Sequence, residues 1–215
     1  MNENLFEAQY DITKKSKILK FYETNKIVIF VVIFSIFIAI ASFIYYSEAK
    51  EKKRTLLLNR YVEANIYLEN DNRNKAKEIL ENIIFSNDST YSTLSLFLII
   101  NENLTTDQKK VSSLFDHVLN NCKFETELKN LIIFKKALVQ TSFVSESELL
   151  EALNPLLNKE TLWKAHALLL LGDYFYSKNE NMKAKEFYVK LLSLKNLHKY
   201  FNDRARLQLS LIAND

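Results

Sequence analysis

The sequence predicts an all-α protein in which a single N-terminal transmembrane helix is followed by a solenoid of helical repeats. Three observations support this fold class. The 215 residues include one glycine and one proline, against a usual ~7% and ~5%, and tight β-hairpins favour glycine in their turns. A stretch of twenty residues near the N-terminus carries no charge. The remainder alternates apolar stripes at helical spacing with short polar breaks.

The composition also excludes several classes of function. Rossmann and P-loop nucleotide sites need two or three glycines, and Gly172 is the only one. Cys122 is the only cysteine, which excludes an intrachain disulfide and a cysteine-based zinc cluster. His117, His166 and His198 are too far apart for a metal-ligand pair of the H-E-x-x-H type. The net charge is only +3 and there is no dense basic stripe, so we expect no nucleic-acid partner. From the missing motifs above we also expect no metal, no cofactor and no small-molecule substrate.

The uncharged stretch covers residues 27–46 (IVIFVVIFSIFIAIASFIYY). At 1.5 Å per residue, about twenty residues cross the ~30 Å hydrocarbon core of a bilayer. Tyr45 and Tyr46 stand where an interfacial aromatic belt is expected. We therefore predict a transmembrane helix over 27–46. The alternatives are a buried core helix and a signal sequence cleaved at the small-x-small triplet 39–41.

This span divides the chain into an N-terminal segment, 1–26, and a soluble domain, 47–215. Five lysines lie in the fifteen residues before the span, and five Lys or Arg residues lie in the fifteen that start at Glu48. The positive-inside rule therefore gives no orientation. The N-terminal segment forms either a short interfacial helix or a solvated tail. The charged run at 50–54 is interpreted as the solvated exit from the membrane, with contact to anionic head groups as the alternative.

Short polar breaks separate the helices that the apolar stripes predict. Asn, Asp and Ser residues in these breaks can cap the helix that follows. Ser145 and Glu148 form a capping-box pattern, and Pro155 is expected to kink or end its helix. The predicted helices cover residues 51–69, 72–86, 89–102, 106–120, 125–142, 146–157, 160–177, 181–194 and 199–213.

Two parts of the domain share a pattern of small and large residues. The small residues are Ala64 and Ala76 in one unit, and Gly172 opposite Ala184 in the other; both pairs are twelve residues apart, and the units are separated by 108 residues, or three repeats of 36. The pattern resembles the tetratricopeptide repeat of about 34 residues, in which small residues let two helices approach closely. We predict about four units and a covering C-terminal helix, with an ordinary helical bundle as the alternative. The predicted repeat-packing residues are Ala64, Tyr67, Ala76, Leu80, Gly172, Phe175, Ala184 and Tyr188.

Solenoids of this kind bind partners on a concave face that is built from the first helix of each pair. The concave positions lie one turn from the packing positions. They are apolar and aromatic with few charges, which suits an extended or partly unfolded polypeptide better than an acidic C-terminal tail. The alternative is that most of these side chains pack inside the superhelix. The predicted groove residues are Leu58, Tyr61, Asn65, Leu68, Leu96, Ile99, Phe134, Leu138, His166, Leu169, Asp173 and Tyr176.

No nucleophile and base stand out as a catalytic pair. Asp116 and His117 are adjacent in sequence, but neighbouring residues on a helix point about 100° apart. His166 is interpreted as solvated or groove-lining, His198 as a surface residue, and Cys122 as an inert thiol. We therefore expect no catalytic residue.

Four short stretches around one span resemble the YfgM-like family, the ancillary subunit of the SecYEG translocon in bacterial inner membranes. The stretches are KFYETN at 20–25, STYSTL at 89–94, LWKA at 162–165 leading to Gly172 and Asp173, and LQLS at 207–210. The resemblance covers most of the chain. The Lys- and Asn-rich composition and the near absence of glycine depart from the family.

The resemblance implies a cytoplasmic N-terminus and a periplasmic tetratricopeptide-like domain. It also implies association with the translocon and with a membrane-anchored periplasmic chaperone resembling a prolyl isomerase. We therefore expect a single-pass inner-membrane protein that binds translocon subunits, this chaperone and exported clients, and that is not an enzyme. Three alternatives stay open: a scaffold for another envelope assembly, an all-α enzyme, and an inverted topology with a cytoplasmic domain.

Overall fold

The computed structural model describes residues 17–214, with side chains from residue 21 onward. Every regular element in this range is an α-helix, which confirms the all-α class. The chain divides into two compact units, Met1–Thr55 and Leu56–Asp215. Residues 1–16 of the expected N-terminal segment lie outside the described residues, and the boundaries at 26/27 and 46/47 stay predictions.

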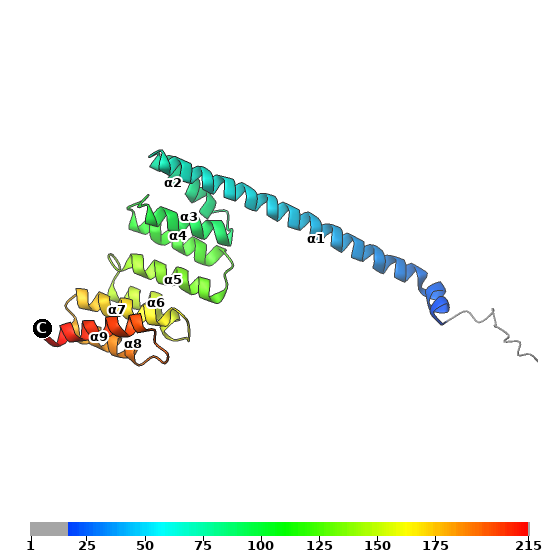
Figure 1. Cartoon of the computed structure of the whole chain (residues 1–215). Coiled ribbons are helices and arrows are strands. Elements are labelled where there is room, and N and C mark those ends of the chain that lie inside the picture. Colours follow the sequence, from blue (N-terminus) through cyan, green and yellow to red (C-terminus); the bar gives the residue numbers. More distant parts are fainter. Residues whose placement is uncertain (1–16, 215) are drawn as a thin grey trace, which may run out of the picture. The chain divides into compact units, whose positions relative to one another are not determined.

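The first element, α1 (Lys17–Glu69), is one helix where the sequence predicted a span at 27–46 and a separate helix at 51–69 (Figure 1). Residues 47–54 (SEAKEKKR) explain the difference, because Ala, Glu, Lys and Arg are strong helix formers and nothing in this segment breaks a helix. A kink interrupts α1 at Asn25, where φ is −115° and ψ is 16°. The charged run at 50–54 is therefore helical and exposed.

The apolar stretch in α1 is long enough to cross a membrane. Its most apolar window has a mean hydropathy of 3.2, and none of that window is buried by protein. This exposure distinguishes it from the core helix of a folded domain. The described residues thus contain one candidate membrane-spanning helix, near the N-terminus.

Eight shorter helices follow, with bounds close to those predicted. The largest difference is at the start of α7, which begins at Lys164 instead of residue 160, because the backbone N–H of Trp163 donates to Thr161 Oγ1 (2.9 Å) in a turn ahead of the helix. The helices are α2 (Arg73–Ile84), α3 (Ser89–Asn101), α4 (Gln108–Asn121), α5 (Thr126–Gln140), α6 (Glu146–Leu157), α7 (Lys164–Ser177), α8 (Asn181–Leu192) and α9 (Lys199–Asn214).

The capping box predicted at the start of α6 is present. The backbone N–H of Ser145 donates to Glu148 Oε2 (2.9 Å), and the backbone N–H of Glu148 donates to Ser145 Oγ (3.3 Å). The Ser145 hydroxyl also donates to Glu148 Oε2 (2.7 Å), and this bond, followed by the one from the Ser145 backbone N–H, holds the pKa of the Glu148 carboxyl below its usual range. Pro155 lies inside α6, which ends two residues later at Leu157.

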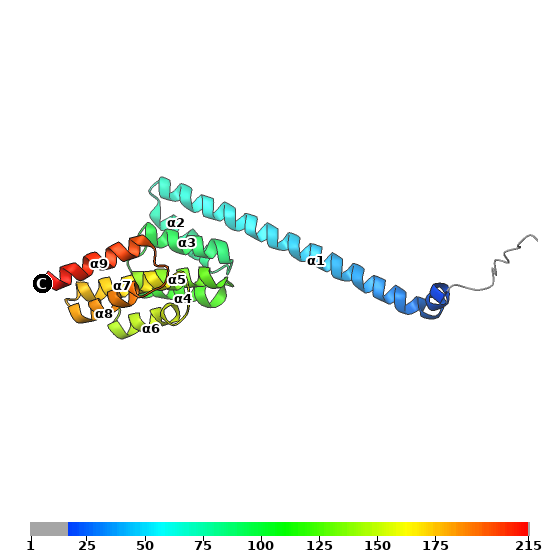
Figure 2. The same cartoon turned by 60° about the horizontal axis from the view of Figure 1, so that its bottom comes forward.

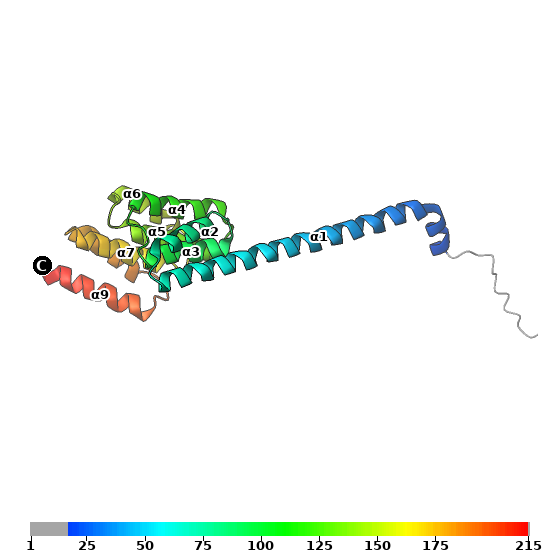
Figure 3. The same ribbon diagram turned by 90° about the horizontal axis from the view of Figure 1, so that it is seen from above.

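From α2 to α9, each helix packs against the next one in the chain (Figures 1 and 2). Further contacts join α2 to α4, α5 to α7, and α7 to α9, and Figure 3 shows α7 between α6 and α9. Ion pairs join helices two apart in the chain: Lys110 with Glu81 (3.1 Å) between α4 and α2, and Lys183 with Glu146 (2.8 Å) between α8 and α6. Helices α2 and α4, α5 and α7, and α7 and α9 therefore lie side by side.

Asparagine takes the place of glycine in the turns. After α1, α3 and α7, the chain donates a backbone N–H to a carbonyl five residues earlier, as in Glu180 to Phe175 (2.9 Å), which is the Schellman pattern of helix termination. This pattern needs one residue in the left-handed region, which Asn and Asp tolerate better than other side chains. The residues in that region, with their φ values, are Asp71 (57°), Asn87 (60°), Asn103 (49°), Asn179 (58°) and Asn196 (55°).

The core consists of two clusters of buried side chains that meet along α5. The first is formed by the end of α1, by α2, α3 and α4, and by Ile132 of α5. The second is formed by Ala137 of α5 and by α6 to α9. The same short helix therefore supports both halves of the domain.

Candidate functional site

In the second core cluster, α7 and α8 pack against each other at the only glycine of the chain. A Cβ on Gly172 of α7 would lie 2.4 Å from Cε1 of Tyr188 on α8, so the tyrosine ring occupies the space that a side chain would need. The sequence analysis placed Ala184 opposite Gly172. Ala184 is fully buried, but the ring that meets this position belongs to Tyr188.

Tyr188 links three helices through its hydroxyl. Its Oη donates to Asp173 Oδ1 of α7 (2.7 Å), and Arg204 of α9 approaches Asp173 Oδ2 at 3.6 Å. Burial, and then the hydrogen bond to Asp173, raise the pKa of Tyr188 well above its usual value. The hydroxyl therefore stays protonated and acts as a donor in the physiological range.

The predicted repeat-packing residues are buried, with one exception. Tyr67 is half-buried and packs against the first core cluster. The buried residues are Ala64, Ala76, Leu80, Gly172, Phe175, Ala184 and Tyr188.

Burial corrects part of the predicted groove. Leu96 and Ile99 of α3 are fully buried in the first core cluster, so they cannot line an open groove, and Leu169 of α7 is only 9% exposed. The predicted positions were wrong here because Leu96 and Ile99 lie, with Ser92 and Ser95, on the one face of α3 that packs into the core. Leu58 and Leu138 are exposed. The half-buried members are Tyr61, Asn65, Leu68, Phe134, His166, Asp173 and Tyr176.

Two of the predicted groove residues, Phe134 and His166, meet in a cluster of half-buried rings. The other two rings belong to Trp163, at the N-terminal end of α7, and Phe201 of α9. We call these four residues the aromatic cluster. Ring centroids lie 5.5 Å apart for Phe134–Trp163 and for Phe134–His166, 4.9 Å for Trp163–His166 and 4.7 Å for His166–Phe201.

His166 lies at the centre of this cluster, in contact with all three other rings. Burial lowers the pKa of its imidazole below the ordinary 6.5, and the Leu162 carbonyl one turn earlier acts weakly in the opposite direction. A charged imidazolium is disfavoured there because it would lose hydration. The cluster is therefore an uncharged aromatic surface at neutral pH.

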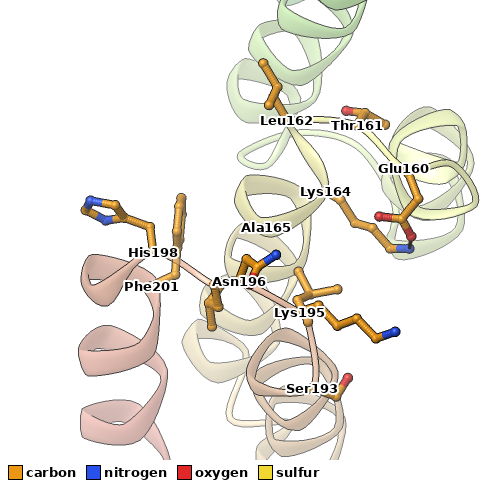
Figure 4. Close-up of a pocket in the computed structure, with 12 residues that line it drawn as sticks. Glu160, Thr161, Leu162, Lys164, Ala165, Ser193, Lys195, Asn196, His198 and Phe201 are labelled. Carbon is orange, nitrogen blue, oxygen red and sulfur yellow. Dashed lines mark hydrogen bonds and ion pairs between the residues drawn. The ribbon is translucent and has the colours of Figure 1, made fainter.

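A cavity of about 670 Å³ opens beside the aromatic cluster, with Phe201 as a shared wall. We call it the α7–α9 cavity. It is lined by residues 160–162, 164 and 165, which precede and open α7, by the α8–α9 connection at 193–198, and by Phe201. Figure 4 shows Glu160 and Lys164 meeting on one side, with His198 and Phe201 of the α9 end on the other. The volume falls within the ~300–1,000 Å³ typical of ligand sites.

The charged groups of this cavity are unevenly paired. Glu160 Oε1 and Lys164 Nζ lie 3.1 Å apart and neutralise each other. Lys195 is exposed, and within residues 17–214 it forms no ion pair. His198 Nδ1 accepts the backbone N–H of Tyr200 (3.2 Å) at the start of α9. The lining therefore carries one uncompensated positive charge.

Sequence reasoning missed both the α7–α9 cavity and two members of the aromatic cluster. Trp163 was noted only as part of the LWKA stretch, and Phe201 was assigned to a covering helix. Rings at 134, 163, 166 and 201 come from three helices, and no periodicity within one helix brings them together. Only the spacing of whole helix pairs along the sequence could have indicated that these four rings meet.

The remaining candidate for chemistry is Cys122. It is 8% exposed, and burial raises the pKa of its thiol, which disfavours the reactive thiolate. Within the described part of the chain, no three His, Cys, Asp or Glu side chains are placed to hold a metal ion. Comparison with protein-family models, curated proteins and solved structures finds no match to this chain.

Proposed function

We propose that this is a single-pass membrane protein whose helical domain binds partner polypeptides. The observation that carries the proposal is the aromatic cluster: three helices present four half-buried rings beside an open cavity. Aromatic side chains that are partly exposed and held by several elements are typical of protein-binding surfaces. The apolar stretch of α1, which is not covered by protein, would anchor this domain to a bilayer.

We further propose that the domain is tetratricopeptide-like. Three features support this: α2 and α4, α5 and α7, and α7 and α9 lie side by side, Ala64 and Ala76 are fully buried, and Gly172 meets an aromatic ring of the following helix. The turns after α1, α3 and α7 share one type of hydrogen bonding, as expected for a repeated unit. Odd-numbered helices would form the binding side.

The proposed partners follow from the resemblance stated above. They are subunits of the translocon, a membrane-anchored periplasmic chaperone and exported clients, with the N-terminus in the cytoplasm and the domain in the periplasm. The mechanism is binding alone. Anchoring the domain and its partners in one membrane raises their effective concentration, so that modest affinity suffices.

Site-specific photo-crosslinking in intact membranes tests this proposal. A photoreactive residue at Leu138 or Tyr176, on the predicted groove, should crosslink to a translocon subunit or to the chaperone. The matched control is Val189, an exposed apolar residue on α8 (51%), which should give no such crosslink. Alanine at Tyr61, Phe134 and Tyr176 should reduce capture of the same partner.

The same membranes distinguish the alternatives. Crosslinks to a different envelope assembly, with none to the translocon, would support the scaffold alternative and contradict the translocon proposal. A reporter fused after Asp215 and assayed in each compartment decides the topology. Equal crosslinking from the groove positions and from Val189 would contradict the proposed binding side.

A further inference from the structure

We infer that the α7–α9 cavity binds an acidic segment of polypeptide, with an apolar side chain against Phe201 and flanking carboxylates toward Lys195. The inference rests on the proposed function, because it names the class of partner that one end of the binding side selects. The inference also goes beyond the groove predicted from the sequence. That groove has few charges and was expected to suit an extended polypeptide better than an acidic tail.

The charges at the cavity favour a negatively charged ligand. Its only carboxylate, Glu160, is paired with Lys164. Lys159 and Lys199 adjoin the lining at residues 160 and 198, and both are exposed. Within residues 17–214, neither they nor Lys195 forms an ion pair. One carboxylate next to the lining, that of Glu127, accepts the backbone N–H of Leu162 (3.4 Å). Lys195 in the lining, with Lys159 and Lys199 adjacent to it in sequence, leaves a surplus of positive charge here, and such a surface favours acidic partners.

The apolar part of the lining favours an apolar side chain in the same ligand. Leu162 is 76% exposed at the edge of the cavity, and Ala165, Leu194 and Leu197 line it together with Phe201. An apolar side chain that entered would bury surface against these groups and would reach the ring that contacts His166 at 4.7 Å. The site would therefore select an apolar residue as well as negative charge.

The polar lining favours polypeptide over lipid as the occupant. Thr161, Ser193 and Asn196 line the cavity. Thr161 Oγ1 accepts the Trp163 N–H (2.9 Å) and the Ser193 hydroxyl donates to the Lys190 carbonyl (2.7 Å), which leaves the Thr161 O–H, the Ser193 oxygen and the Asn196 amide for a ligand. An extended polypeptide has an N–H and a C=O at nearly every residue to pair with such groups, whereas an acyl chain has none. An anionic lipid would use the lysines but would leave these groups unpaired.

The test uses the full chain in detergent micelles and three labelled ten-residue peptides. Each peptide has the same central Leu-Phe pair, flanked by glutamates, glutamines or lysines. We expect the glutamate peptide to bind about tenfold more tightly than the glutamine peptide, and the advantage to shrink with added salt. Binding should also change the fluorescence of Trp163, the only tryptophan, because its ring belongs to the aromatic cluster.

Charge reversal at the rim locates the site. Lys195→Glu with Lys199→Glu should abolish the preference for the glutamate peptide. The matched control reverses two other exposed lysines that form no ion pair within the described residues, Lys123→Glu with Lys185→Glu, and should keep the preference. Circular dichroism checks that both variants are folded, and Lys195→Gln with Lys199→Gln provides a milder second variant.

The outcomes separate this inference from the proposed function. Equal binding of all three peptides would overturn the acidic specificity and leave polypeptide binding in place. If no peptide binds, both the inference and the proposed binding side are contradicted. Binding of phosphatidylglycerol vesicles that needs Lys195 and Lys199, without binding of any peptide, would overturn the inference in favour of an anionic lipid.

Discussion

The ring of Tyr188 on α8 lies where the side chain of residue 172 on α7 would be, so that the only glycine of the chain leaves no room for a Cβ. Three ring atoms lie within 2.9 Å of the position that a Cβ on Gly172 would take. The ring cannot withdraw freely, because it is fully buried and its hydroxyl bonds Asp173. The contact therefore predicts that the effect of a side chain at residue 172 on stability changes sign when the Tyr188 ring is removed.

Gly172→Ala should lower the free energy of unfolding by about 1–3 kcal/mol, the usual cost of overpacking a core. Alanine is otherwise the better helix former by about 1 kcal/mol. In a Tyr188→Val background, which removes the obstructing ring atoms, the same Gly172→Ala change should therefore be neutral or stabilising. Urea unfolding of the four chains, followed by Trp163 fluorescence, measures the coupling. A cost that is the same in both backgrounds would contradict the contact.

Asn179 should respond to substitution in the opposite sense from an ordinary helical asparagine. Its φ of 58° lies in the left-handed region, so Asn179→Ala should destabilise by about 1 kcal/mol and Asn179→Gly should be neutral or stabilising. Asn82, exposed inside α2, is the control, where alanine should stabilise relative to glycine. Thermal unfolding midpoints of the four variants give the comparison, and the same ranking at both sites would be evidence against the turn geometry.

His166 should make stability depend on pH. Because its pKa in the folded protein lies below the ordinary 6.5, the unfolded chain binds the proton more readily. The contribution of the neutral imidazole is complete above pH 6.5 and is lost as the pH falls through that value toward the folded pKa. His166→Asn should remove this loss between pH 7.5 and 5, measured by urea unfolding, whereas His198→Asn, at an exposed position, should retain it.

Cys122 should react slowly with alkylating reagents in the folded protein. Its sulfur is buried and its thiol pKa is raised, so both access and the thiolate fraction are low. We expect labelling at least about tenfold slower than for Ser142→Cys in a Cys122→Ser chain, since Ser142 is exposed. Urea should bring the two rates together. Equal rates without urea would show that the thiol is accessible.

Local patterns predicted the helices well. The bounds of α6 (Glu146–Leu157) agree at both ends with the prediction, because its capping box and apolar stripe are both local signals. The break predicted between 46 and 51 was wrong. A change from apolar to charged residues was interpreted as a boundary, although the charged residues favour the helix as strongly as the apolar ones do.

The candidate site was less predictable, because it depends on contacts between helices far apart in sequence. Leu96 was assigned to the groove by analogy of position, but it lies on the same face of α3 as the buried Ser92, Ser95 and Ile99, and it is fully buried. Phe201 and Trp163 lie 38 residues apart in the chain, and both contact His166. Such a cluster follows from how helix pairs stack, which composition and spacing within one pair do not determine.

The position of α5 between the two core clusters has a consequence for cooperativity. In a linear array, stability is a sum of unit terms and nearest-neighbour interface terms. Ile132 and Ala137 belong to one helix but to different clusters, so unfolding of either half removes one set of neighbours from α5. The two halves are thus coupled in series through a single helix, and a stress applied at one end of the array can reach the other end only through these fifteen residues.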